Sequence, residues 1–275
     1  MAPRLGEVEK NLKRHLLFIE KAQKKGAQLI VFPELSLTGY TLMDLVPEVA
    51  IDPSNSPALD RLKAASRGID VVFGFMMETT KGIYHNAAGY LSGGKIIHVH
   101  RKVFLPTGGM FEEAKFFARG RGFEAFATRF GRAGMMVCRD FLSLASSYLL
   151  FAGGAEYIIV ISAAPGRGMS ERPGFATTRM WELMGEAVSY FCTTFVIYCN
   201  RVGFEDGKAF GGGSFVFDPT GRSLFKASEL DEELALVDLE PGAIRAARTK
   251  WTFKRDDEPE IVLRSLARIV RDDED

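Results

Sequence analysis

The chain has 275 residues, of which 47% are hydrophobic and 25% are charged, a composition typical of globular proteins. Lysine plus arginine and aspartate plus glutamate both number 35, so the net charge is zero and no basic run suggests a nucleic-acid partner. No apolar stretch approaches the roughly 20 residues of a membrane span. The length suits one large domain, and we expect a single domain over residues 1–275.

Apolar runs and helical spacings alternate along the chain and predict a mixed α/β protein built in layers. In chain order the predicted elements are a helix over 11–24, a strand over 29–32, a helix over 58–66, strands over 71–77, 83–91, 95–100 and 134–138, a helix over 141–152, a strand over 157–161, a helix over 178–190, and strands over 194–199, 214–217 and 234–237. A turn at residues 218–221 is expected to join the last two strands, and loops are expected over 162–174 and between Gly203 and Gly211. From Pro241 on we expect a short helix, an extended stretch and a charged end over 271–275.

Three reactive side chains stand where predicted strands end: Glu34, Lys102 and Cys138. A carboxylate in such a place is unusual because burying it without a partner is costly. In open α/β sheets, clefts form beyond the carboxyl ends of the strands. If the three strands are neighbours, the three side chains converge on one rim of the sheet.

Cys138 lies between a strand and the amino end of the helix expected over 141–152. The dipole of that helix would favour a thiolate, which suits a nucleophile. The alternative is that Cys138 is a small buried hydrophobic residue. Cys192 and Cys199 lie in apolar segments and are expected in the core. Three cysteines do not make a disulfide framework, so we expect the reducing cytoplasm, and no signal peptide is recognisable.

A cysteine nucleophile needs a base, most often a histidine. The histidines are His15, His85, His98 and His100. None follows Cys138, which excludes a papain-like order, and none forms a metal-site spacing. The other candidate base is the Glu34 carboxylate, which can accept the thiol proton while Lys102 offsets its charge and stabilises an oxyanion.

Five segments in order resemble the nitrilase, or carbon–nitrogen hydrolase, superfamily, whose members use a Glu–Lys–Cys triad. They are Phe32-Pro-Glu34 with Thr38-Gly-Tyr40, Arg101-Lys102 with Pro106 and Phe111-Glu-Glu113, Val137-Cys138-Arg-Asp140, Asn200-Arg-Val-Gly203, and Gly212-Gly-Ser214. The resemblance runs along nearly the whole chain and implies a four-layer αββα sandwich. Residues 34–44 look most like the glutaminase portion of glutamine-dependent NAD synthetases, but no ATP-handling domain follows, so NAD synthesis is not expected.

By this resemblance Glu34 is the general base, Lys102 stabilises charge and Cys138 is the nucleophile. Glu113 matches an additional glutamate that family members place near the lysine. The implied reaction is attack of the thiol on an amide-like carbon of a small molecule, loss of ammonia or an amine, and hydrolysis of a thioester. It uses no metal and no organic cofactor.

The resemblance also implies roles for Tyr40 and Arg139. The backbone N–H of Arg139 would complete an oxyanion hole with Lys102, and the side chains of Tyr40 and Arg139 would contact the substrate. Arg139 stands where aromatic or acidic residues are common, so a solvated or structural arginine is the alternative. Family members open with a buried strand before a Pro-x-x-Gly segment; here Pro3-Arg-Leu-Gly6 stands almost at the start, so we expect that strand to be missing or shortened.

The family further implies association through helices into a homodimer or a higher homo-oligomer. Two other functions stay open. The first is a glutaminase-type subunit that supplies ammonia to a separate synthetase. The second is a non-catalytic binding or scaffold protein that retains the fold, against which the intact Glu34, Lys102 and Cys138 argue. The residues do not distinguish amide, carbamoyl and nitrile substrates.

Overall fold

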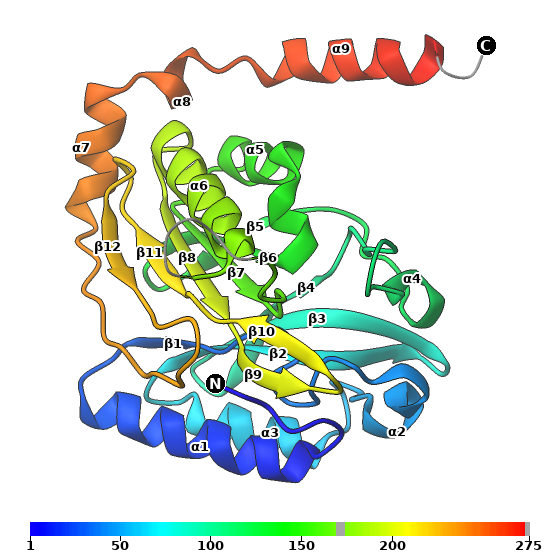
Figure 1. Ribbon diagram of the computed structural model, residues 1–275. Coiled ribbons are helices and arrows are strands. Elements are labelled where there is room, and N and C mark those ends of the chain that lie inside the picture. Colours follow the sequence, from blue (N-terminus) through cyan, green and yellow to red (C-terminus); the bar gives the residue numbers. More distant parts are fainter. Residues whose placement is uncertain (169–173, 273–275) are drawn as a thin grey trace.

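The computed structural model describes residues 1–168 and 174–272. Two β-sheets lie face to face, and helices cover the outer face of each, which gives four layers (Figure 1). Apolar side chains between the sheets, such as Tyr90, Met135 and Ile159, are buried. This is the αββα layering that the resemblance implies.

The first sheet has the order β1-β2-β3-β4. Its strands are β1 (Leu29–Val31), β2 (Asp70–Thr80), β3 (Ile83–Ser92) and β4 (Lys95–Arg101). β1 and β2 are parallel, and the other pairs are antiparallel. Two helices, α1 (Val8–Lys24) and α3 (Pro57–Ala65), cover its outer face (Figure 1). The apolar positions of α1 recur at helical spacing, so Leu12, Ile19 and Ala22 are buried against the sheet.

The second sheet has the order β12-β11-β8-β7-β6-β5. Its strands are β5 (Ala125–Thr128), β6 (Gly131–Val137), β7 (Tyr157–Ser162), β8 (Phe195–Asn200), β11 (Phe215–Phe217) and β12 (Ser223–Lys226). The three central strands β6, β7 and β8 are parallel, and every residue of β7 is buried, as its continuous apolar run predicts. α5 (Leu144–Ala152) and α6 (Ala176–Phe191) cover the outer face.

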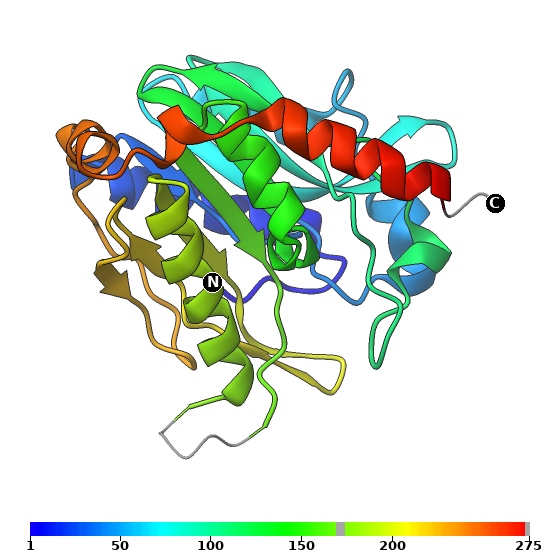
Figure 2. The same ribbon diagram turned by 90° about the horizontal axis from the view of Figure 1, so that it is seen from above.

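Shorter elements surround the two sheets. They are η1 (Met43–Leu45), α2 (Val46–Val49), α4 (Glu113–Phe116), η2 (Cys138–Leu142), β9 (Val202–Glu205), β10 (Lys208–Gly211), α7 (Gly242–Lys250), α8 (Phe253–Asp256) and α9 (Pro259–Asp272). α9 runs beyond α5, away from the sheets (Figures 1 and 2). Its side chains Leu263, Leu266 and Val270 are more than half exposed.

The predicted helices and the strands of the two sheet cores are confirmed, and four expectations need correction. The strand expected over 234–237 is wrong, because β11 pairs with β12 instead and residues 232–240 form no regular element. The loop expected between Gly203 and Gly211 is instead part of the β9–β10 hairpin. The helix expected over 141–152 is split into η2 and α5. An extended stretch was expected before the charged end, but α9 occupies most of that stretch.

The expected absence of a first strand agrees with the structure, in which residues 1–7 contain no strand. Among the residues that the structure describes, β1 therefore has β2 as its neighbour on one side and no strand on the other. Residues 169–173 of the loop expected over 162–174 and residues 273–275 of the expected charged end lie outside the described residues.

Gly74 on β2 lies directly against the turn that carries Glu34. A Cβ atom at this position would lie 2.3 Å from the backbone nitrogen of Leu35 and 2.6 Å from the carbonyl oxygen of Pro33. The Ser36 hydroxyl also bonds the backbone of Gly74. Because backbone atoms cannot move aside cheaply, the turn requires glycine here.

We predict that Gly74→Ala lowers the free energy of unfolding by roughly 1–3 kcal/mol, because the added methyl group overpacks a backbone contact. Gly108→Ala is the control: no atom lies within 4 Å of its would-be Cβ, and we expect a change below about 0.5 kcal/mol. Urea denaturation measures both. Equal transition midpoints for the two variants would contradict the close packing of β2 on the turn.

Candidate active site

Glu34 begins the turn that follows β1 and is completely buried. Leu35, the next residue, has φ of +47°, a strained conformation for a branched side chain, so the turn is sharp. Three donors surround the carboxylate: Asn86 Nδ2 at 2.6 Å and Lys102 Nζ at 2.8 Å from Oε1, and Ala163 N at 2.6 Å from Oε2. Together these donors satisfy a carboxylate that burial would otherwise destabilise.

Lys102 lies just beyond β4 and is also buried. Its ammonium donates to Glu34 Oε1 at 2.8 Å and to Glu113 Oε1 at 2.7 Å, and the Tyr40 hydroxyl donates to the same Glu113 oxygen at 2.5 Å. Burial alone would lower the pKa of Lys102, but the carboxylates of Glu113 and Glu34 outweigh it and raise the pKa. Lys102 is therefore a permanent cation between two acids.

Glu113 lies at the start of α4 and has one oxygen without a partner. Burial raises its pKa, and the Lys102 charge opposes that rise. Its Oε2 atom is buried and makes no hydrogen bond within the described residues. The sequence motif thus correctly selected Glu113 as the acid beside Lys102, whereas Glu112 is exposed.

Cys138 follows β6 as the first residue of η2 and is buried. Its φ of +47° is unusual for a non-glycine residue, and such backbone strain is common at functional sites. Burial raises the pKa of the thiol; the Glu34 charge raises it further, while Lys102 lowers it. The charges of Glu34 and Lys102 therefore both act on the sulfur. The three strands before these residues are not neighbours as expected: β1 and β4 are opposite edges of one sheet, and β6 lies in the other.

The expected helix dipole does not contribute to Cys138 as the sequence suggested. A short 3₁₀ turn stands between Cys138 and α5, which begins only at Leu144. The dipole of an α-helix acts mainly within its first turn. The expectation of a thiolate stabilised by a helix terminus is therefore wrong, and Lys102 is the group that favours ionisation.

Asp140 links the cysteine turn to the segment that carries Lys102. Its carboxylate accepts bonds from the backbone nitrogens of Val103 and Phe104 at 3.0 and 2.8 Å, and from that of Val137 at 3.2 Å. The ring nitrogen Nε2 of His100 lies 2.8 Å from the same carboxylate. Sequence reasoning missed this role, although an acid directly after an apolar strand is the signal that selected Glu34.

A buried ion pair holds the loop that carries Tyr40. Arg201 Nη1 lies 2.7 Å from Glu205 Oε2, and the other oxygen of Glu205 accepts from the backbone nitrogens of Tyr40 and Thr41 at 2.9 and 2.7 Å. The guanidinium also lies 4.0 Å from the ring centroid of Phe210. Glu205 was not selected from the sequence, because it follows no apolar strand.

The remaining candidate residues lie at the edge of this cluster or outside it. The Arg139 side chain is exposed, with its guanidinium 6.0 Å from the ring centroid of Phe104. Cys192 and Cys199, expected in the core, are only half-buried. Within residues 1–168 and 174–272, no group of three or more metal-ligating side chains is arranged to hold an ion.

Residues 1–249 match the family model described as carbon–nitrogen hydrolase. The chain belongs to this family. It is 32% identical over 244 residues to the glutamine-dependent NAD(+) synthetase of Thermotoga maritima, with 86% of this chain and 40% of the synthetase covered. It is 30% identical over 260 residues to an (R)-stereoselective amidase of a Pseudomonas species, with 93% and 88% covered.

A solved structure of a carbon–nitrogen hydrolase from Helicobacter pylori matches with a TM-score of 0.83 and 25% identity over 94% of each chain. Family membership confirms the resemblance and makes the protein a carbon–nitrogen hydrolase of the nitrilase superfamily. The chain spans about two fifths of the length of the NAD synthetases that it matches. The helices in the described part of the chain are too short or too polar to cross a membrane.

We predict that alkylation of Cys138 by iodoacetamide accelerates about tenfold per pH unit from about pH 7 to 9.5 without a plateau, because only the thiolate reacts and burial raises the pKa of the thiol. Lys102→Met removes a cation that lowers the pKa, so labelling slows. Glu34→Gln removes an anion that raises it, so labelling speeds up.

Peptide mass spectrometry separates Cys138 from the two half-buried cysteines, which act as internal standards. Two results would contradict the charges assigned around the sulfur. One is an alkylation rate of Cys138 that stops rising below about pH 8; the other is the same change of rate in Lys102→Met and Glu34→Gln.

Proposed function

We propose that the protein hydrolyses an amide-like C–N bond of a small molecule through a Glu34–Lys102–Cys138 triad and a thioester intermediate. The observation that carries this proposal is the buried Lys102 ammonium, bonded to Glu34 and Glu113 at 2.8 and 2.7 Å. Asp140, in the turn that begins with Cys138, bonds the backbone of the two residues after Lys102. This arrangement supplies a base, a fixed positive charge and a nucleophile. We assign the whole reaction to one domain over residues 1–275.

The first half of the reaction forms the thioester. Glu34 takes the proton of the Cys138 thiol as the sulfur attacks the carbonyl carbon, and the carbonyl electron pair moves to oxygen. Lys102 Nζ and the backbone N–H of Arg139 stabilise that oxyanion. The tetrahedral intermediate then collapses, the C–N bond breaks, and the nitrogen leaves as ammonia or an amine with the proton held by Glu34.

The second half restores the enzyme. Glu34 removes a proton from water as the oxygen attacks the thioester carbon, and the same two donors stabilise the second oxyanion. The C–S bond breaks, the acid product leaves, and the proton returns to the Cys138 sulfur. The raised pKa of the thiol favours proton transfer during the attack over a thiolate formed beforehand, because the free thiol stays protonated until Glu34 accepts its proton.

Glu113 and Tyr40 keep the cation in position. Glu113 bonds Lys102, and the Tyr40 hydroxyl bonds Glu113 in turn. The Tyr40 ring meets the rings of Phe111 and Phe210 edge-on, at centroid distances of 6.3 and 5.9 Å. We infer that this aromatic face contacts the apolar part of the substrate and that the exposed Arg139 side chain meets any carboxylate it bears.

A second candidate function is a glutaminase-type subunit that supplies ammonia to a separate synthetase. The similarity of most of this chain to two fifths of NAD(+) synthetases favours it. Both candidates share the triad chemistry. They differ in substrate, which is glutamine for the glutaminase-type subunit and another small amide for the hydrolase. They also differ in whether a partner protein accepts the ammonia.

Cellular location and assembly follow from surface features. The three cysteines are free, which suits the cytoplasm. Exposed apolar side chains occur on α5 and α6 as well as on α9, including Leu149, Leu183 and Leu266, each at least half exposed. Because large exposed apolar groups mark association surfaces, we infer a homodimer that covers these helices.

We predict that Cys138→Ala and Glu34→Gln each lower kcat by on the order of 10⁴-fold or more, because residues of a triad act as a unit. The matched controls, Cys192→Ala and Glu112→Gln, replace the same residue types outside the cluster and leave the rate within about twofold. The measurement is ammonia release from glutamine, small amides, ureido acids and nitriles. Turnover by Cys138→Ala at the wild-type rate would remove the triad mechanism.

A further inference from the structure

Two buried hydroxyl groups, those of Ser162 and Tyr198, lie beside Cys138. The last residue of β6 pairs with Ile161 on β7, so Cys138 and Ser162 come next to each other at the carboxyl ends of these two strands. Val160 on β7 pairs with Tyr198 on β8. Because strand residues two apart share a face, the side chains of Ser162 and Tyr198 lie on the same face of the second sheet.

This face is the one that α6 covers (Figure 1). The Trp181 ring of α6 stacks on the Tyr198 ring at a centroid distance of 5.2 Å, and the Phe141 ring of η2 stacks on Trp181 at 6.4 Å. Glu34 and Lys102 instead follow β1 and β4 of the first sheet. The sulfur therefore has charged groups from one sheet and a pair of hydroxyl groups from the other.

The two hydroxyl groups have no hydrogen-bond partner in the part of the chain that the structure describes. Ser162 is 0% exposed and Tyr198 is 2% exposed, so water does not reach them from the surface. Most buried polar groups in native proteins are paired, because an unpaired one destabilises the fold. A pair of unbonded hydroxyl groups behind a nucleophile therefore suggests that they bond a group whose charge changes during the reaction.

Ser162 stands between the sulfur and the phenol. Burial raises the pKa of both the Cys138 thiol and the Tyr198 phenol, and the Ser162 hydroxyl lowers both of these pKa values. A hydroxyl lowers a neighbour's pKa by donating a hydrogen bond to the neighbour's anion. A phenol is a better donor than an alcohol, so Tyr198 is suited to donate to Ser162 while Ser162 donates to the sulfur.

On the basis of the proposed function, we propose that Ser162 donates a hydrogen bond to the Cys138 sulfur when the sulfur carries negative charge, and that Tyr198 positions Ser162 by donating to its oxygen. The charge arises when the C–S bond of the second tetrahedral intermediate breaks and its electron pair moves to sulfur. Glu34 then returns the proton to the sulfur, and each hydroxyl keeps its own proton. Ser162 contacts a reacting atom, whereas Tyr198 acts through Ser162.

The first test follows the thioester by mass spectrometry after the amide substrate has been removed. In Ser162→Ala the acyl group on Cys138 should decay about 10- to 100-fold more slowly, because the leaving sulfur loses a hydrogen bond to its charge. Tyr198→Phe should slow the decay about three- to tenfold. In the Ser162→Ala background Tyr198→Phe should change the rate less than about twofold, because the phenol acts only through the serine.

The second test needs no substrate. Alkylation of Cys138 by iodoacetamide at pH 8 should slow at least about threefold in Ser162→Ala, because the reactive thiolate loses a donor. Tyr198→Phe should slow it less and should add nothing in the Ser162→Ala background. If no amide is turned over, the proposed function fails, and this arm still decides whether Ser162 acts on the sulfur.

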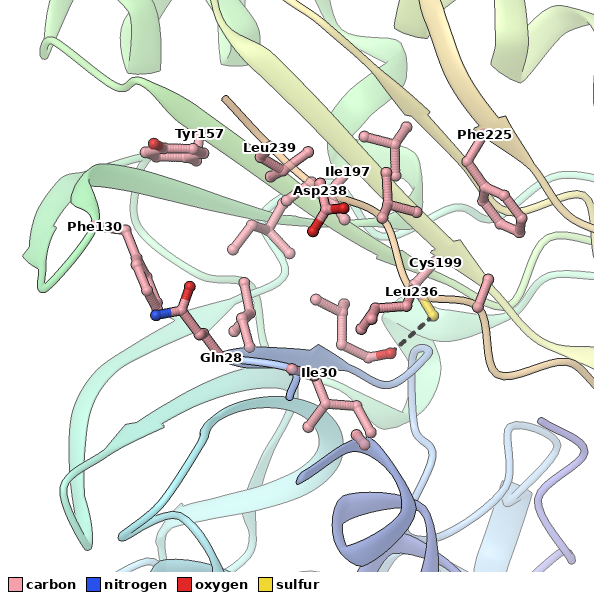
Figure 3. Close-up of a pocket in the computed structure, with 18 of the residues that line it drawn as sticks. Gln28, Ile30, Phe130, Tyr157, Ile197, Cys199, Phe225, Leu236, Asp238 and Leu239 are labelled. Atoms are coloured by element: carbon pink, nitrogen blue, oxygen red, sulfur yellow. Dashed lines mark hydrogen bonds between the residues drawn. The ribbon is translucent and has the colours of Figure 1, made fainter. Parts of the chain in front are cut away.

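Tyr157→Phe and Ser189→Ala are the matched controls. Tyr157 is buried at the amino end of β7, on the opposite face from Ser162, where it lines a cavity of about 790 Å³ between the sheets (Figure 3). Ser189 is fully buried on α6, and its carbonyl accepts from Thr194 N at the amino end of β8. Both controls should keep thioester decay and alkylation within about twofold of wild type.

Thermal midpoints distinguish this role from a structural one. Because the hydroxyl groups of Ser162 and Tyr198 are unbonded, removing either should leave the midpoint unchanged or raise it. A lowered midpoint together with slower decay would assign both groups to the stability of the fold and overturn the proposal. Two other results would also overturn it: alkylation of Ser162→Ala within about twofold of wild type, or effects that multiply in the double variant.

Discussion

The buried ammonium of Lys102 is the interaction on which the rest of the site depends. It is shared by the carboxylates of Glu34 and Glu113, at 2.8 and 2.7 Å, in a place from which solvent is excluded. Ions lose hydration when buried, and removal of one partner typically costs about 3–5 kcal/mol because the other charge is left uncompensated. The end of β1, the end of β4 and the start of α4 must therefore be held in register.

Two further buried carboxylates maintain that register. Asp140 accepts from the backbone of Val137 before the cysteine turn and from the backbone of Val103 and Phe104 after Lys102, so these two segments are held together. Glu205, paired with Arg201, fixes the backbone of the Tyr40 loop. Catalytic groups act best when their neighbours hold them rigidly, and here charged hydrogen bonds supply the rigidity. By fixing these segments, Asp140 and Glu205 help to keep Lys102, Glu34 and Cys138 in place away from solvent.

The sequence predicted the helices and the sheet cores, because apolar periodicity is a local signal. It did not predict how Glu34, Lys102 and Cys138 are placed: the strands before them are not neighbours on one rim, since β1 and β4 are opposite edges of one sheet and β6 lies in the other. It did not predict the roles of Asp140 and Glu205, whose importance arises from partners 36 or more residues away. The strand expected over 234–237 failed for a related reason: a strand exists only if a neighbour pairs with it. Likewise, the helix dipole argument failed because a 3₁₀ turn intervenes after Cys138.

In the proposed mechanism the Cys138 sulfur carries the acyl group during turnover. The most direct measurement is acid quenching in the steady state with an amide that releases ammonia, followed by mass spectrometry of the intact protein and its peptides. We expect a mass increase equal to the acyl group, located on the peptide containing Cys138 and absent from Cys138→Ala. Full turnover with no acyl group on that peptide, or with the group on Cys192 or Cys199, would contradict it.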